Sequence, residues 1–355
     1  MIYRECGVYR TTYAEDMRLF PLPADRAGVA ALVAAAVLLP PLLGTYWLKG
    51  ILIPFLIFSL ATLGLNFLTG FAGLLSLGQS GFMAVGAYTG VILYGRYHVL
   101  LPLSLLAAGL MAAAIGAVAG TPSLRIKGLY LAVATLASQF IITWAIQHVR
   151  WISGGVFATV NAPPVRLGGL VLDTALGQYY LALAIVLILT VFGMNLARGR
   201  IGRAWMAIRD RDIAAEIIGI SLLRFKLLAF MVSAFYAGIA GALVVFCWYG
   251  SANIEEFNLI NSIKILGMVI IGGMGSILGS FLGAGFVTLL PIFVSLAMHQ
   301  IGGWSGGLVT NDLISSLEDV VFGALIVLFL AAEPLGLARL WNTVKDYLRL
   351  WPFPY

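Results

Sequence analysis

Apolar stretches close to or above 20 residues long recur through most of this chain, with short polar segments between them. An α-helix needs about 20 consecutive apolar residues to cross the hydrocarbon core of a bilayer. The stretches are apolar on all sides and contain Gly and Pro, whereas the strands of a membrane β-barrel alternate with a period of two. The sequence therefore predicts an all-α, polytopic membrane protein.

The composition agrees, because 61% of the 355 residues are apolar and only 10% are charged. An ordinary soluble domain has roughly 25% charged residues. We expect about ten transmembrane helices, some of them broken or re-entrant at glycine-rich segments. The expected spans are 28–48, 51–68, 72–94, 99–119, 128–148, 177–196, 226–248, 262–279, 281–298 and 313–332.

The basic residues predict the orientation of these spans. Alternate loops hold sixteen Lys and Arg on one side and four on the other, with Lys264 inside a span. Because the basic excess lies in the cytoplasm, both termini and the loop 197–225 are expected there. The division is then a cytoplasmic tail at 1–27 with no signal-peptide h-region, a permease domain at 28–338, and a second tail at 339–355. The net charge of +6 lies in these loops, which favours lipid and not nucleic acid as its partner.

A first glycine-rich segment runs from residue 64 to 88. Glycine permits positive φ and close backbone approach, so a broken helix that lines a cavity is one interpretation. The polar residues then available to a solute pathway are Asn66, Ser76, Gln79 and Ser80. The alternative is that the small residues only let helices pack closely, as the four-residue spacing of Gly86 and Gly90 suggests. The sequence leaves both open.

A second glycine-rich segment runs from residue 270 to 286. Gly275, Gly279 and Gly283 recur at four-residue intervals, which predicts a smooth strip on one face of a helix. Helix packing is the favoured interpretation. The similarity of the two segments suggests an internal repeat.

The loop at 202–226 is too long for a simple connector. We expect a helix over 203–218 that ends at Gly219. Apolar residues such as Trp205, Ile208 and Ile213 would form a surface for a partner protein, with Arg203 at its start; Arg209, Asp212 and Glu216 would share another face. The alternative is an amphipathic helix lying on the lipid surface.

Four segments in this order resemble one known family. They are LTGFAGLLSLGQSGFMAVGAY, GRAWMAIRDRDIAAEIIGISLLRFKLLAF, ILGMVIIGGMGSILGSFLGAG and VVFGALIVLFLAAEPLGL. Together they resemble the M-type permeases of branched-chain amino acid ATP-binding-cassette importers, whose relatives include urea and short-chain amide permeases. The resemblance covers residues 60–337, leaves 151–177 unmatched, and implies that 202–219 is the element that docks on the ATPase.

The resemblance also implies the partners: a second, homologous permease in a heterodimer, two cytoplasmic ATPase subunits and a periplasmic solute-binding protein, in a bacterial inner membrane. The chain has no GxxxxGK[ST] phosphate loop, so we expect ATP to be bound by partner subunits, with no cofactor or metal in this chain. An ATP-independent channel or facilitator for urea or a similar solute is the alternative. Without an HExxH motif, an intramembrane His and Asp cluster or a nucleophile elbow, a membrane enzyme is disfavoured.

Overall fold

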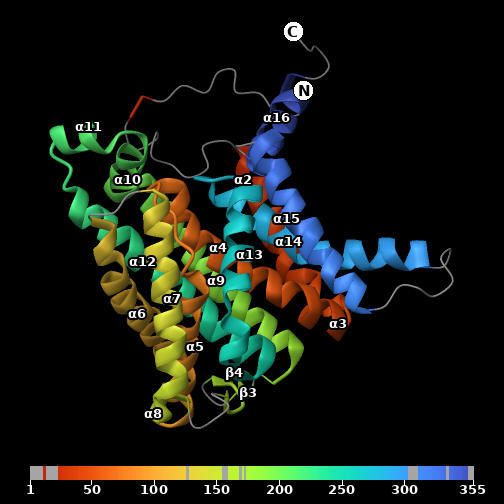
Figure 1. Ribbon diagram of the computed structural model, residues 1–355. Helices are drawn as coiled ribbons and strands as arrows, with labels where there is room; N and C mark the ends of the chain where they lie inside the picture. The colour runs from red at the N-terminus through yellow and green to blue at the C-terminus, as the bar shows by residue number, and fades with distance from the viewer. Residues whose placement is uncertain are drawn as a thin grey trace.

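The computed structural model describes residues 11–12, 23–124, 128–153, 159–167, 170–171, 173–302, 311–332 and 336–350. The described residues are mainly helical (Figure 1). The N-terminal half contains α2 (Pro23–Leu38), η1 (Pro40–Leu42), α3 (Thr45–Trp47), η2 (Leu48–Leu52), α4 (Ile53–Asn66), η3 (Phe67–Phe71), α5 (Gln79–Gly95), α6 (Leu101–Gly120), η4 (Thr121–Leu124), α7 (Leu129–His148) and α8 (Arg150–Ser153).

The C-terminal half begins with three short strands, β1 (Thr159–Asn161), β2 (Arg166–Leu167) and β3 (Leu170–Val171). It continues with α9 (Ala175–Arg198), α10 (Arg200–Asp210), α11 (Asp212–Ile217), α12 (Leu222–Leu243), η5 (Val244–Tyr249), β4 (Ser251–Asn253), η6 (Ile254–Phe257), α13 (Leu259–Gly272), α14 (Ile277–Gly302), α15 (Asn311–Ala332) and α16 (Gly336–Leu350). The segments η2, η3 and η5 are π-helical and continue α-helices.

The helices confirm a polytopic all-α membrane protein. Within the described residues, six helical spans are long and apolar enough to cross a membrane: Thr45–Phe71, Leu101–Gly120, Tyr130–His148, Ala175–Arg198, Leu222–Tyr249 and Ile277–Leu296. Shorter apolar helical stretches lie at Arg26–Leu42, Leu259–Gly272 and Val320–Phe329. Each of the ten expected segments contains a helix, while the number that crosses the bilayer stays a prediction.

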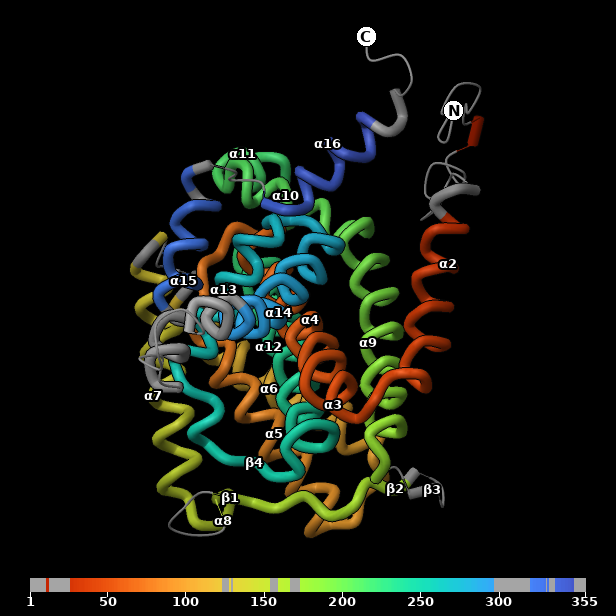
Figure 2. Tube along the Cα trace, turned by 90° about the vertical axis from the view of Figure 1, so that its right-hand side faces the viewer, coloured from red at the N-terminus to blue at the C-terminus, as the bar shows by residue number. Residues whose placement is uncertain are grey.

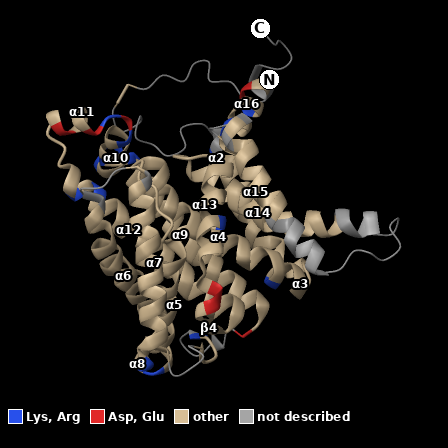
Figure 3. Cartoon of the chain, in the orientation of Figure 1, with Lys and Arg blue, Asp and Glu red and all other residues tan. Residues whose placement is uncertain are grey.

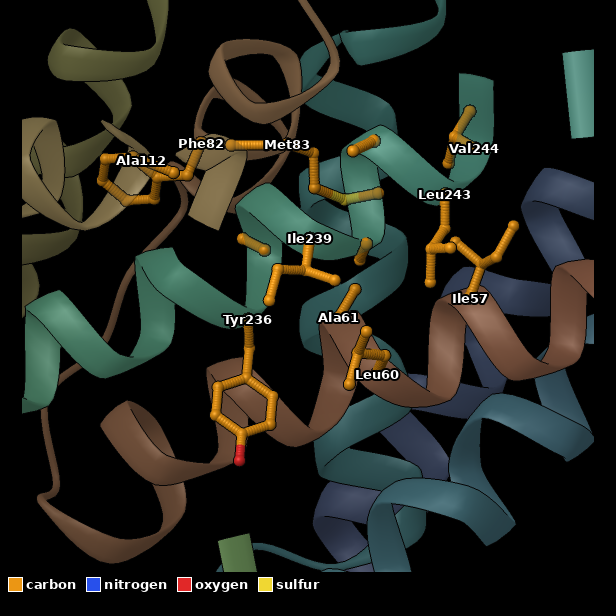
Figure 4. Packing of buried hydrophobic residues seen from close by; sticks show 14 of the residues in the cluster. Ile57, Leu60, Ala61, Phe82, Met83, Ala112, Tyr236, Ile239, Leu243 and Val244 are labelled. Atoms are coloured by element: carbon orange, nitrogen blue, oxygen red, sulfur yellow. The ribbon is translucent and has the colours of Figure 1, made fainter. Parts of the chain in front are cut away.

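Two helical spans form the centre of the bundle. In their most apolar stretches, 83% of the residues of Thr45–Phe71 and 78% of those of Leu222–Tyr249 are buried, against 28% for Ala175–Arg198. Figure 4 shows side chains of α12 (Tyr236, Ile239, Leu243) beside Ile57, Leu60 and Ala61 of α4. Since α12 also packs along α5 and α6, it is the helix around which the others assemble.

Glycine permits the closest of these contacts. A Cβ atom at Gly86 of α5 would overlap the backbone of Gly238 in α12, and one at Gly241 of α12 would overlap the carbonyl oxygen of Met83. Gly90 lies next, with the Ala242 methyl 3.2 Å from the position of an added Cβ. Gly86 and Gly90 therefore line the contact between α5 and α12, where side chains would hold the two backbones apart.

Two helices differ from their expected bounds: one begins later than the sequence predicts, and the other ends earlier. The helix expected over 72–94 begins only at Gln79, because residues 72–78 form an irregular turn after the π-helical segment η3. The helix expected over 262–279 ends at Gly272, followed by a turn in which Gly273 and Gly275 have φ of 114° and 80°. Gly275 thus lies off the helix, and the expected glycine strip is reduced to Gly279 and Gly283.

The two ends of the bundle differ. The helices α10, α11 and α16 lie at one end, where Lys, Arg, Asp and Glu gather, and α8 and the small strands lie at the other (Figures 1 and 3). At that second end β1 pairs antiparallel with β4, with Val160 opposite Ala252. This pairing ties part of the segment 151–177, which lies outside the four motifs of the sequence analysis, to the loop between η5 and α13. Figure 2 shows α2 at the edge of the bundle on the side of α9, joined to it by a 2.9 Å hydrogen bond from the Tyr179 hydroxyl to the Ala36 carbonyl oxygen.

Candidate functional site

A cavity of about 320 Å³ lies among α4, α5, η5, η6, α13, α14 and α15. Its lining comes from segments more than 200 residues apart, between Gly50 and Phe322. Irregular backbone borders it on two sides: α5 begins just before Ser80, and η5 is π-helical. Discontinuous and π-helical segments in membrane proteins commonly surround binding sites, because freed backbone groups need a cavity or a partner.

Two charged side chains of opposite sign line this cavity, Glu256 of η6 and Lys264 of α13. Lys264 is the one charged residue of α13, and ionisable groups in predominantly apolar helices of membrane proteins are rare and usually functional. The Tyr249 hydroxyl hydrogen-bonds the Glu256 carboxylate, and the Asn261 amide donates to the Glu256 backbone carbonyl oxygen. The carboxylate is therefore held at the cavity by its neighbours.

Ser80 adds a hydroxyl to the lining. Its side chain is 1% exposed, and its Oγ atom has no hydrogen-bond partner among the residues that the structure describes. The backbone N–H of Ser80 donates to Ser262 Oγ at 2.9 Å, and that hydroxyl donates to Gln139 Oε1 at 2.6 Å. The start of α5 is thereby fixed against α13 and α7, while the Ser80 hydroxyl itself has no partner among the described residues.

The remaining wall is mainly apolar. It consists of aromatic, sulfur-containing and aliphatic side chains: Pro54, Phe58, Met83, Val244, Phe257, Met268, Val287, Leu290, Pro291 and Phe322, with Trp248 and Tyr249 at one side. A mostly apolar cavity with a few placed polar groups is the usual form of a small-molecule site.

Three of the four residues expected in the pathway have structural roles instead. Gln79 donates to the Ala61 carbonyl oxygen at 3.2 Å and accepts from Ser233 Oγ at 3.2 Å, which joins α5 to α4 and α12. Ser76 is fully buried, and its Oγ accepts from the backbone N–H of Gly78. Both side chains already have partners, and neither lines the cavity; of the four, only Ser80 does.

Asn66 is the third of these residues, and it joins the two glycine-rich turns. Its amide nitrogen donates to the Ser276 carbonyl oxygen at 2.7 Å and to Ser280 Oγ at 2.8 Å, while its oxygen accepts from the Gly275 N–H at 2.8 Å. The contact requires Gly70, because a Cβ there would overlap Asn66 Oδ1 and the Gly275 nitrogen. The two segments that suggested a repeat thus meet each other.

Arg209 of α10 reaches this same meeting point. Its Nη1 donates to the Gly70 carbonyl oxygen at 2.9 Å, and it lies 3.1 Å from where a Cβ of Gly275 would stand. Its other guanidinium nitrogens pair with the neighbouring Asp210 at 3.2 Å. One side chain therefore connects the loop helices α10 and α11 to both turns, and we call Asn66, Gly70, Arg209 and Gly275 the turn junction.

The loop helix predicted over 203–218 is instead two helices. α10 ends at Asp210 and α11 begins at Asp212, because Arg211 between them has extended backbone (φ −155°, ψ 103°). Gly219 follows α11 with φ of 89°, a conformation that favours glycine, so its expected role at the helix end holds. The break places Arg209 and Glu216 on different helices, so the single face predicted for Arg209, Asp212 and Glu216 is wrong.

The break also separates the apolar residues of the loop into two groups. Trp205 and Ile208 are 0% and 4% exposed, and Trp205 Nε1 donates to the Phe225 carbonyl oxygen at 2.8 Å. They pack α10 onto the rest of this chain. Ile208 is therefore buried and does not contribute to a surface for a partner protein. Ile213, by contrast, is 69% exposed, and Ile217 and Ile218 are also mostly exposed.

The charged residues of the loop follow the same division. Arg203 and Glu216 are exposed, whereas Asp212 lies 3.9 Å from the Nζ of the buried Lys226 at the start of α12. That ion pair fixes the start of α11 on α12. The outward surface of α11 is therefore apolar, with Glu216 among the isoleucines.

Sequence reasoning missed Glu256 as a cavity residue and treated Lys264 only as an exception. The signal for Lys264 was present, since it is the one Lys or Arg that falls inside an expected span and not at its first residue. Glu256 lies in a loop between expected spans, and no periodicity indicated that η6 folds back under α13.

Comparisons with known proteins agree with the resemblance. Residues 48–330 match the family described as branched-chain amino acid transport system, permease component. The chain is 35% identical over 276 residues to the high-affinity branched-chain amino acid transport system permease protein LivM of Escherichia coli K12, which covers 70% of this chain and 64% of LivM. The LivM protein of Salmonella typhimurium is 34% identical with the same coverage.

A relative with a different name is also similar. The autoinducer 2 import system permease protein LsrC of Enterobacter sp. strain 638 is 30% identical over 245 residues, which covers 67% of this chain and 66% of LsrC. This chain therefore spans slightly under two thirds of the curated relatives that it matches. No solved structure matches it.

Proposed function

This chain belongs to the family of permease components of branched-chain amino acid transport systems, and from that membership we propose that it is the membrane-spanning subunit of an ATP-driven importer that carries a branched-chain amino acid into the cytoplasm. The family consists of permeases and not of enzymes. A homologous second permease, two cytoplasmic ATPase subunits and a periplasmic solute-binding protein would complete the importer in a bacterial inner membrane.

The observation that carries the ATP-driven proposal is the exposed apolar surface of α11 and of Ile218, which directly follows it. Ile213, Ile217 and Ile218 are 69%, 81% and 74% exposed at the charged end of the bundle. A permease driven by separate ATPases needs such a surface, since force must pass between the subunits, whereas a self-sufficient facilitator does not. The turn junction supports the proposal, because Arg209 joins these loop helices to the turns before α5 and α14.

The cavity supports a small solute with both polar and aliphatic parts. Its charged pair and Ser80 would bind polar groups, and its apolar wall would accept a branched side chain. An ATP-independent facilitator for urea remains the second candidate. The dense apolar wall speaks against it, because urea has no aliphatic part.

Replacing Ile213 with Asp is expected to prevent ATPase docking. A carboxylate at the centre of a desolvated contact costs about 2–4 kcal/mol of binding free energy, which would lower ATPase affinity by roughly 30-fold or more. Co-purification of the ATPase with the permease, and ATP-dependent leucine uptake into proteoliposomes, should both fall. Insertion and folding should be unchanged, because Ile213 is exposed in this chain.

The matched control is Ile208→Asp, which places the same carboxylate in the interior of the chain, where Ile208 is 4% exposed. That variant should lower the yield of folded permease instead. If Ile213→Asp retains ATPase binding and uptake, α11 is not the coupling element. That result would favour the alternative that the loop helix lies on the lipid surface. Uptake that never requires ATP would favour the facilitator.

Both termini are expected on the cytoplasmic side, as the sixteen-to-four distribution of basic residues predicts. The expectation can be measured with protease-cleavable tags in sealed, right-side-out vesicles. An N-terminal tag should survive external protease and be cut only after the vesicles are opened. Cleavage from outside would reverse the orientation and place α11 away from any ATPase.

A further inference from the structure

We propose that α16 (Gly336–Leu350) is an interfacial helix that lies on the bilayer surface at the charged end of the bundle and binds anionic lipid head groups there. The helix begins after residue 330, where the match to the permease family ends. The proposal goes beyond the importer function, because it holds whatever the solute and the energy source of this permease are.

The sequence of α16 forms one apolar face. Apolar residues recur along it at spacings of three and four, as on one side of a helix: Leu337, Leu340, Trp341, Val344 and Tyr347. Most residues between them are polar: Arg339, Asn342, Thr343, Lys345 and Asp346. The spans of the bundle are apolar on all sides and suit the interior of a bilayer. A helix with two different faces and little net hydrophobicity suits its surface.

The apolar face of α16 is exposed beyond the first turn. Leu337 packs against the cluster that contains Ile271 and Phe322. Four later residues of the face are 40–61% exposed: Leu340, Trp341, Val344 and Tyr347. In α10, which is also amphipathic, the apolar residues are instead buried in this chain. The described residues therefore leave the face of α16 to a partner outside the chain.

The position of α16 favours lipid as that partner. The helix α15 contains the apolar stretch Val320–Phe329 and ends at Ala332, and α16 begins four residues later. Because four residues span at most about 14 Å, α16 begins close to the bilayer that α15 enters. The helix leaves the bundle obliquely at the edge next to α15, apart from α11 (Figures 1 and 2). An edge position gives it access to the surrounding lipid.

The residue types of α16 also fit a lipid surface. Trp341 and Tyr347 belong to the exposed apolar face, and Trp and Tyr gather at membrane interfaces because they combine an apolar ring with a polar group. The helix holds three basic residues and one acidic residue: Arg339, Lys345, Arg349 and Asp346. This positive excess complements the negative surface of a membrane that contains anionic lipid.

The first turn of α16 is fastened to the turn that follows α13. Gly336 is buried with φ of 66°, and an added Cβ there would lie 2.6 Å from the Gly273 nitrogen and 2.7 Å from the Ile271 carbonyl oxygen. Gly273 lies two residues before Gly275, which belongs to the turn junction. Lipid bound to α16 would therefore hold this turn at a fixed height relative to the bilayer.

The test uses the full-length permease in vesicles, with an NBD fluorophore on a cysteine in α16. The cysteine is introduced as Val344→Cys, on the apolar face, or as Asn342→Cys, on the polar face; both positions are exposed. Cys6 is replaced with serine, and Cys247 is retained because it is buried. The vesicles contain phosphatidylcholine and phosphatidylglycerol with brominated acyl chains, which quench a fluorophore that enters the lipid.

Quenching should be several-fold stronger at position 344 than at position 342. Equal quenching at the two positions would overturn the interfacial helix. Quenching at 344 should also weaken in vesicles of phosphatidylcholine alone, since the basic residues then lose their counterpart. If it is unchanged there, the binding of anionic head groups is overturned.

A matched pair of aspartates tests the apolar face. Trp341→Asp should lower the binding of α16 to lipid by about tenfold or more, because one large apolar side chain is lost from the contact. Thr343→Asp changes the net charge by the same amount on the polar face and should largely preserve quenching at 344. Trp341 and Thr343 are both exposed, so size-exclusion profiles should match the wild type. Equal losses in the two variants would overturn the apolar contact.

A protein partner would give a different result. The label at 344 would then stay unquenched by brominated lipid, and its emission would shift to shorter wavelength only after ATPase subunits are added. That outcome would overturn the lipid proposal and assign the face of α16 to the ATPase. Neither outcome alters the test of the importer function, which is ATP-dependent uptake.

Discussion

Replacing Gly283 with leucine is expected to abolish assembly of a folded permease. A Cβ at this position would overlap the carbonyl oxygen of Met268 and lie 2.9 Å from the Gly272 nitrogen, and both are backbone atoms of α13 that cannot rotate away. The two helices would have to separate, at a cost of about 3 kcal/mol or more. The measurement is the yield of monodisperse protein by size-exclusion chromatography, together with its thermal unfolding. Gly279→Leu should behave alike, since a Cβ there would approach the Gly272 carbonyl oxygen within 2.7 Å.

The matched control is Gly323→Leu in α15. Gly323 is exposed, and no atom among the described residues lies within 4 Å of an added Cβ. Its yield and unfolding should equal those of the wild type. If Gly283→Leu instead assembles normally but selects a different solute, then this face of α14 lines the pathway and its role in packing is secondary.

Replacing Arg209 with alanine is expected to uncouple ATP hydrolysis from uptake. The side chain donates to Gly70 at 2.9 Å and adjoins Gly275, so its loss removes the connection between α10 and the two turns that precede α5 and α14. A charge-assisted hydrogen bond contributes about 1.5–3 kcal/mol, which corresponds to a drop in uptake of roughly tenfold to a hundredfold. Uptake per ATP hydrolysed should fall, while ATPase binding through α11 persists.

Arg211→Ala serves as the control, because Arg211 is exposed at the break between α10 and α11. It removes the same charge two residues away without touching either turn. Arg209→Lys should recover little, since an ammonium cannot reproduce a guanidinium that serves Gly70 and Asp210 together. Equal loss of uptake in the two alanine variants would mean that net charge, and not the turn junction, is what matters.

The helices were predictable because their signal is local. Each expected span is a run of apolar residues, and each contains a helix in the structure. The glycine-rich segments were also visible, and the turns lie within them, at 72–78 and after Gly272. What a local pattern could not give was the position of each turn within its segment, which depends on the contact between Gly70 and Gly275.

Partners distant in sequence decided the rest. Asn66 and Gln79 look like solute-binding groups until their partners on α14 and α12 are known, since a polar residue in an apolar run predicts either. Ile208 and Ile213 look equivalent on one helix, and only the extended backbone of Arg211 separates a buried from an exposed residue. Glu256 and Lys264 line one cavity because η6 packs next to α13, and no periodicity in the sequence predicts that packing.

The hydrogen bonds of Asn66 also set an order of events during synthesis. Its amide nitrogen binds Ser276 and Ser280, which are 210 and 214 residues further along the chain. At about 5–20 residues per second, a ribosome needs roughly 10–40 s to make that length. Until those residues have been made, the Asn66 amide has neither of these two acceptors. The contact between the two turns can therefore form only after the last third of the chain has been synthesised.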